Sequence, residues 1–154
     1  MLETWLEFQR TTLLLKCEGL EPDALRSRPV ESSLLSLHGL VRHMAEVERH
    51  WYTRVLLADP SAAPHWWDEA PDAELWPLED ADWDEDLATW HRECETSRAN
   101  AAPLDLDHLG SMPGDTRGEH VSLRWIHVHM IEEYARHNGH ADLLRELVDG
   151  AVGD

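Results

Sequence analysis

Apolar residues recur at spacings of three and four in four separate stretches of the chain, and this periodicity restricts the fold more than any other feature. Residues at these spacings line one face of an α-helix, and such a face has to be buried against another element. No strand-rich region competes with these stretches. The expected helices span residues 2–18, residues 32 or 33 to 57, residues 80 or 82 to 101, and residues 122–148. We therefore predict an all-α fold, a four-helix bundle.

The connections between these helices bear on the topology. Residues 20–30 form a short proline-bearing linker, whereas the two later connections, residues 58–80 and 103–121, are long. About 20 residues are enough to cross the length of a bundle, so the second and third helices are free to run parallel. The second long connection could hold a short hairpin, although no residue in it requires one.

The charge of the chain excludes two classes of partner. Lys and Arg number 13 and Asp and Glu number 31 among the 154 residues, which gives a net charge of −18. A nucleic-acid backbone or an anionic membrane would be repelled, and no basic stripe overrides this field. No apolar run approaches the roughly 18 residues of a membrane span, the amino end does not read as a signal peptide, and Cys17 and Cys94 are too few for a disulfide framework. We expect a single cytoplasmic domain over residues 1–154.

A carboxylate and an imidazole occupy inward positions of the last helix. Glu133 and His137 lie four residues apart in the apolar stripe, so they stack on one face, and His43 lies at the edge of the stripe of the second helix. A buried carboxylate costs several kcal/mol unless it is paired or bound to a metal. Two interpretations satisfy Glu133: a buried Glu–His ion pair, or a metal held by His43, Glu133 and His137 with a fourth position open to water or substrate.

Such a ligand set does not select one metal. Zinc suits it, and so do ferrous iron and nickel. His140 is a weak candidate for a further ligand, a partner of a ligand, or a catalytic residue. Of His127 and His129 we expect at most one near the site, because rings two residues apart on a helix point in different directions. We expect an interfacial position for His50 and solvated surface positions for His65, His91, His108 and His120.

Two further features of the sequence allow alternatives. Gly139 costs the last helix about 1 kcal/mol relative to alanine, and we prefer a continuous helix in which another backbone approaches this glycine closely. The tryptophans of the first long connection, Trp66, Trp67 and Trp76, either cover the open end of the bundle over a substrate or cap its core, and we favour the cap.

Two segments resemble the DinB/YfiT-like superfamily, and more narrowly its actinobacterial branch. They are residues 38–48 (HGLVRHMAEVE) and residues 129–146 (HMIEEYARHNGHADLLRE). The resemblance implies a four-helix bundle with parallel middle helices. It also implies a metal site with one histidine from the second helix and two residues four apart on the last, which here are His43, Glu133 and His137. The glutamate variant is similar to the metal-binding domain of mycothiol-dependent maleylpyruvate isomerase, whose further carboxy-terminal domain the 154 residues do not include.

The resemblance and the residues together leave four interpretations of the function. The leading hypothesis is a divalent-metal-dependent S-transferase that uses a low-molecular-weight thiol such as mycothiol. Its substrate would be a small thiol or an electrophile. The alternatives are a metal-dependent hydrolase and a non-catalytic metal-binding stress-response protein whose bundle serves homodimerisation. A metal-free bundle with a Glu–His pair is the fourth reading.

Overall fold

The computed structural model describes residues 1–67, 72–76, 78–112 and 119–153, and these residues are mostly helical. Its helices and strands are α1 (Leu2–Cys17), α2 (Pro22–Arg26), α3 (Leu37–Arg49), the π-helical turn η1 (His50–Val55), α4 (Trp83–Ala101), β1 (Leu109–Ser111), β2 (His120–Ser122) and α5 (Leu123–Asp149). The prediction of a helical fold is confirmed. The small sheet is the hairpin that the second long connection could accommodate.

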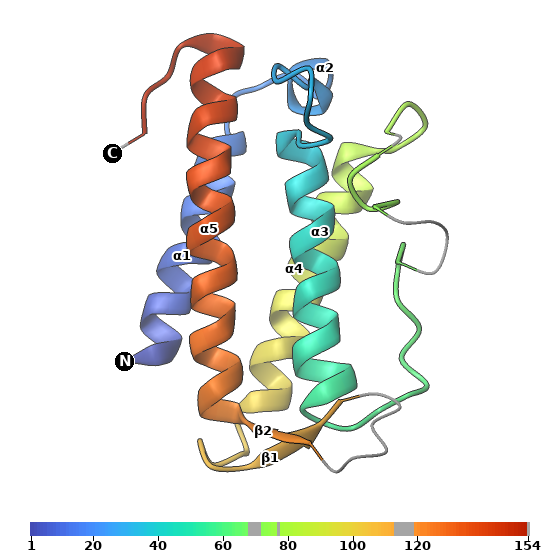
Figure 1. Ribbon diagram of the computed structural model, residues 1–154, viewed down its shortest axis with the longest axis vertical. Coiled ribbons are helices and arrows are strands. Elements are labelled where there is room, and N and C mark those ends of the chain that lie inside the picture. Colours follow the sequence, from blue (N-terminus) through green and yellow to red (C-terminus); the bar gives the residue numbers. More distant parts are fainter. Residues whose placement is uncertain (68–71, 77, 113–118, 154) are drawn as a thin grey trace.

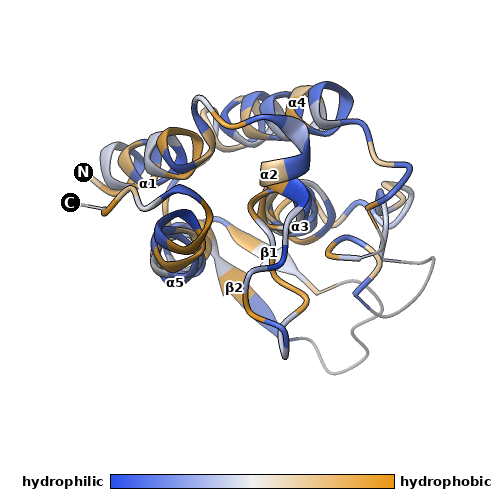
Figure 2. Ribbon diagram, turned by 90° about the horizontal axis from the view of Figure 1, so that it is seen from above, coloured by the Kyte–Doolittle hydropathy of each residue, from blue (hydrophilic) through white to orange (hydrophobic). Residues whose placement is uncertain are grey.

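The four long helices lie side by side in two pairs. α1 packs mainly against α5, and α3 packs mainly against α4. Viewed from above, α1 and α5 form one side of the molecule, and α3 and α4 form the other (Figure 2). α3 and α4 run in the same direction, opposite to α1 and α5 (Figure 1). The chain between α3 and α4 therefore has to return along the length of the molecule.

α3 begins later than the sequence predicts. Its N-cap is Ser36, whose hydroxyl accepts a hydrogen bond from the Gly39 N–H, so the expected start at Ser32 or Ser33 is wrong. Ser33 instead accepts a hydrogen bond from the Leu35 N–H, which is the local turn that serine favours outside helices. The second predicted helix also does not continue as an α-helix to residue 57, because it changes to the π-helical turn at His50.

The other two long helices that follow begin where the sequence predicts. The Asp82 carboxylate accepts hydrogen bonds from the first N–H groups of α4, and the Ser122 hydroxyl accepts one from the Trp125 N–H of α5. These side chains satisfy backbone donors that a helix leaves without partners at its start. α5 ends at Asp149, and its C-cap Gly150 adopts the left-handed conformation with φ of 81°. The short helix α2 lies within the predicted proline-bearing linker of residues 20–30.

The hairpin closes the lower end of the molecule. β1 and β2 pair antiparallel, with Gly110 opposite Val121. Gly110 packs directly on the end of η1, where an added Cβ would lie 2.5 Å from the Val55 carbonyl oxygen and 2.8 Å from Leu56 Cα. Only glycine fits there without displacing the backbone. This close contact therefore fixes the hairpin against η1 at the end of α3.

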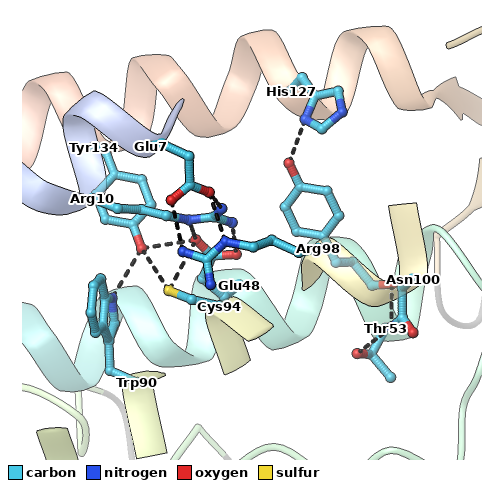
Figure 3. A network of polar contacts seen from close by, with 11 residues as sticks. Glu7, Arg10, Glu48, Thr53, Trp90, Cys94, Arg98, Asn100, His127 and Tyr134 are labelled. Atoms are coloured by element: carbon cyan, nitrogen blue, oxygen red, sulfur yellow. Dashed lines mark hydrogen bonds and ion pairs between the residues drawn. The ribbon is translucent and has the colours of Figure 1, made fainter. Parts of the chain in front are cut away.

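A buried polar network joins all four long helices (Figure 3). The Arg10 guanidinium of α1 donates two hydrogen bonds to the Glu48 carboxylate of α3. Tyr134 of α5 donates to the same carboxylate at 2.8 Å and accepts from Trp90 of α4 at 3.0 Å. Burial alone would lower the pKa of Arg10, but the Glu48 carboxylate raises it above its ordinary value. The network therefore keeps the charge of Arg10 while it ties the helices together.

Two further expectations from the sequence concern the helices. Nothing in the described residues lies within 4 Å of a Cβ added at Gly139, so the predicted close approach of another backbone is wrong. Among the described residues, no helix is both long enough and apolar enough to cross a lipid bilayer.

Candidate metal centre

His43, Glu133 and His137 come together between α3 and α5. One donor atom from each of the three side chains lies within 4.8 Å of the others. Glu133 Oε2 is 3.5 Å from His137 Nε2, and the rings of His43 and His137 have centroids 4.7 Å apart. The carboxylate–imidazole distance is close to the roughly 3.3 Å expected between two ligands of a tetrahedral zinc ion with bonds of about 2.0–2.1 Å.

These three side chains lie at the edge of the core. Their exposed fractions are 20% for His43, 14% for Glu133 and 12% for His137. The prediction that Glu133 and His137 are core positions is therefore wrong. In this part of α5 the next residues along, Tyr134 and Asn138, are buried instead. The edge position leaves the three donors reachable from solvent, as a site that exchanges water or substrate requires.

His137 is held in its neutral form. Burial, together with the like charges of His43, His140 and Arg136, lowers its pKa from 6.5 to about 3. Only the neutral imidazole has a lone pair for a metal ion. His137 is thus in the protonation state that coordination requires at neutral pH.

Glu74, from the long connection between α3 and α4, orients His43. Its carboxylate lies 3.3 Å from His43 Nδ1 and is buried. Burial raises the pKa of Glu74, but the contact with His43 and smaller hydrogen-bond contributions outweigh this effect, so the pKa is lowered overall. A carboxylate that accepts from one ring nitrogen leaves the other nitrogen available as a metal ligand. Sequence reasoning missed Glu74, because no spacing along the chain links this connection to α3.

The donor set suits a divalent metal. It combines two imidazoles, of which one is held neutral, a carboxylate, and a second carboxylate behind one of the histidines. This is the composition of catalytic sites for zinc, and ferrous iron and nickel accept it as well. The residues present therefore fit the kind of metal that the sequence predicts.

A protein-family comparison shows where the chain belongs. The family model of mycothiol S-transferases matches residues 1–150. The chain belongs to the mycothiol S-transferase family. This family is DinB/YfiT-like, so the resemblance seen in residues 38–48 and 129–146 is confirmed. A search of curated proteins and a search of solved structures each gave no match.

A second cluster of possible metal ligands adjoins the candidate centre in this member of the mycothiol S-transferase family. His129, Glu132 and Glu133 also bring donor atoms within 4.8 Å of one another. Arg136 forms ion pairs with both Glu132 and Glu133, so this pairing does not distinguish the two clusters. However, the second cluster has one imidazole where the first has two, and its Glu132 is 49% exposed. This arrangement makes His43, Glu133 and His137 the better candidate.

His140 lies beside the centre without joining it. Its Nδ1 is 3.4 Å from His137 Nδ1, on the ring edge opposite the Nε2 that faces Glu133. Of the two histidines that flank the stripe, only His129 adjoins the site, as predicted; its Nε2 is 3.7 Å from Glu133 Oε1. His127 is buried instead and lies 2.7 Å from the Tyr52 hydroxyl.

The remaining histidines divide into two groups. His91, His108 and His120 are exposed, as predicted. The prediction of a solvated surface position is wrong for His65, which is partly buried and lies 2.9 Å from the Glu93 carboxylate. His38 is fully buried and contacts the Asp86 carboxylate at 2.8 Å. These ion pairs connect helices and loops and include none of the three candidate ligands.

The tryptophans of the long connection cap the core in part. Trp66 and Trp67 pack against the hydrophobic core, which agrees with the favoured interpretation. Their backbone N–H groups both point to the buried Glu46 carboxylate. Trp76 instead packs against Arg28, whose guanidinium lies 4.0 Å from the ring centroid.

Proposed function

We propose that this chain is a divalent-metal-dependent S-transferase that joins the thiol of mycothiol to an electrophilic substrate. The observation that carries the proposal is the convergence of His43, Glu133 and His137 in a chain of the mycothiol S-transferase family. Zinc is the metal we propose, with ferrous iron and nickel as alternatives. The proposal includes a DinB/YfiT-like four-helix bundle formed by the four long helices, and one domain over residues 1–154.

The reaction forms one bond and breaks another. The sulfur of the thiol bonds to the electrophilic carbon, the leaving group departs from that carbon with its electron pair, and the thiol proton is released. A divalent ion in the centre would act as a Lewis acid that lowers the pKa of a coordinated thiol from about 8.5 toward neutrality.

The side chains around the centre have distinct roles in this proposal. His137, neutral because of burial, and His43, oriented by Glu74, present lone pairs to the ion. Glu133 supplies one negative charge. His140 is partly exposed and adjoins His137, so it is the candidate to accept the thiol proton. The exposed edge of the centre is where thiol and electrophile would meet.

Metal analysis of variants tests the ligand assignment. The metal content of the native protein is compared with that of His43→Ala, Glu133→Ala and His137→Ala, with His91→Ala and His108→Ala as exposed controls. Three protein ligands leave no redundancy, so each ligand variant is expected to lose metal and each control to keep it. Equal metal content in all six proteins would contradict the assignment.

Thiol chemistry tests the reaction. The cobalt-substituted protein is expected to develop a thiolate-to-metal charge-transfer band when mycothiol is added, and the metal-loaded protein to consume mycothiol with an electrophile. Retention of metal without either response would favour the hydrolase, or the non-catalytic metal-binding protein with its homodimer.

A further inference from the structure

Three aromatic side chains form a platform next to the candidate metal centre. The platform consists of Trp51 from η1 and of Trp125 and His129 from α5. The rings of Trp125 and His129 are stacked, with centroids 4.9 Å apart and planes at 11°. The Trp51 centroid lies 4.6 Å from that of His129 and 5.1 Å from that of Trp125.

The platform is continuous with the centre. His129 Nε2 is 3.7 Å from Glu133 Oε1, so one residue belongs to the stack and also contacts a proposed ligand. Trp125, His129 and Glu133 follow at intervals of four on α5, which places them in one row along the helix. Eight residues separate Trp125 from Glu133, a distance of about 12 Å along the axis.

The platform is open to solvent, whereas aromatic side chains that only stabilise a fold are usually buried. Trp125 is 45% exposed, and Trp51 and His129 are partly exposed. Large aromatic surface left in contact with water beside a reactive centre is typical of a ligand-binding surface. The edge of the platform also offers a hydrogen-bond acceptor for the hydroxyl groups of a ligand. This acceptor is the Glu132 carboxylate, which lies 3.7 Å from His129 Nδ1.

We infer that this platform binds the sugar portion of the thiol cofactor while the sulfur lies at the candidate metal centre. The inference rests on the proposed function. A sugar ring presents a face of C–H groups, which packs against the electron-rich face of an aromatic ring. A thiol whose sulfur is linked through a short acyl group to an uncharged sugar reaches both sites. The net charge of −18 disfavours thiols that carry phosphates or several carboxylates.

N-acetylglucosaminyl-inositol, the sugar half of mycothiol with its amine kept as an uncharged amide, tests the platform without involving a metal. Its binding to metal-free protein is measured by calorimetry for the native chain and for Trp125→Ala, Trp125→Phe and Trp5→Ala. Trp5 is an exposed tryptophan of α1 and provides the matched control. We expect Trp125→Ala to weaken binding roughly tenfold, as for loss of one well-packed aromatic contact. Trp125→Phe keeps a flat ring and is expected to retain most of the affinity, and Trp5→Ala to leave it unchanged.

The thiol half separates this inference from the proposed function. N-acetylcysteine carries the sulfur without the sugar, so it is expected to perturb the cobalt spectrum of native protein and of Trp125→Ala equally. Native protein that coordinates N-acetylcysteine but does not bind the sugar half would overturn the platform and leave the S-transferase intact. Sugar binding without thiol coordination would overturn the S-transferase and leave the platform. Weaker binding by Trp125→Ala of an aromatic electrophile alone, with mycothiol unaffected, would also overturn the platform.

Discussion

Arg10 and Glu48 face each other through two parallel hydrogen bonds, from Nε to Oε1 at 2.7 Å and from Nη2 to Oε2 at 2.6 Å. Both side chains are almost completely buried, with exposed fractions of 4% and 0%. Two charges held in this geometry depend on each other, because neither has water to replace its partner.

Removing one member of this pair is expected to be strongly destabilising. Arg10→Met leaves the Glu48 carboxylate buried without its cation, which costs about 3–5 kcal/mol of unfolding free energy. Arg98 pairs with Glu7 at the surface, so Arg98→Met is expected to cost only about 0–1 kcal/mol. Urea denaturation measures both. The double variant Arg10→Met/Glu48→Leu removes both charges and is expected to recover most of the loss; a double variant as unstable as Arg10→Met would contradict this account.

Glu74→Ala is expected to weaken metal binding without removing a ligand. The variant loses the carboxylate that accepts from His43 Nδ1, so the imidazole is no longer held in one orientation. Loss of such a partner typically lowers metal affinity by about 10- to 100-fold. Competition with a chelator measures the affinity, and Glu79→Ala, an exposed acid of the same connection, is the control. Equal affinities for Glu74→Ala and Glu79→Ala would show that the contact has no such role.

His50 is expected to make the metal-free protein sensitive to acid. Burial, together with the positive charges of Arg54 and His129, lowers its pKa from 6.5 to about 4. Between these two pH values the unfolded chain binds more protons than the folded one, so lowering the pH favours unfolding. The free energy of unfolding should fall from about pH 6.5 to about pH 4, and less steeply in His50→Gln. Denaturation at several pH values measures the slope, and the exposed His91→Gln should keep the native slope. A His50→Gln profile parallel to the native one would refute this prediction.

Gly110→Ala and Gly139→Ala are expected to change stability in opposite directions. The added methyl group at Gly110 would meet the Val55 and Leu56 backbone, and overpacking of this kind costs about 1–3 kcal/mol. At Gly139 the same methyl group meets nothing within 4 Å in the described residues, and alanine stabilises a helix interior by about 0.5–1 kcal/mol relative to glycine. Thermal unfolding of both variants measures the two shifts, and shifts of equal sign would contradict the packing seen at Gly110.

The helices and the three candidate ligands could be predicted because their signals are local. Glu133 and His137 are four residues apart, and this spacing fixes their common face wherever the helix packs. The exact rotation of α5 depends on its neighbours, so sequence reasoning assigned to Glu133 and His137 the burial that belongs to Tyr134 and Asn138. The choice of the serine that caps α3 also depends on the tertiary packing. The cap is Ser36, which the local sequence does not distinguish from Ser32 and Ser33.

The Glu74 contact and the buried network could not be predicted, for a different reason. Glu74 reaches His43 across 31 residues, and Arg10 reaches Glu48 across 38 residues. Partners so far apart in the chain are selected by the packing of whole elements. A single sequence contains no pattern that identifies them.

The parallel direction of α3 and α4 has a consequence for how such a protein can change over time. Two parallel helices oblige the chain to travel back along the outside of the molecule, and Figure 1 shows this return segment beside α3. Glu74 lies on that segment. The return of the chain that the parallel helices require therefore also places the side chain that contacts His43. New side chains can thus be brought to the centre by substitutions in the return segment, while the helices that carry the proposed ligands stay as they are.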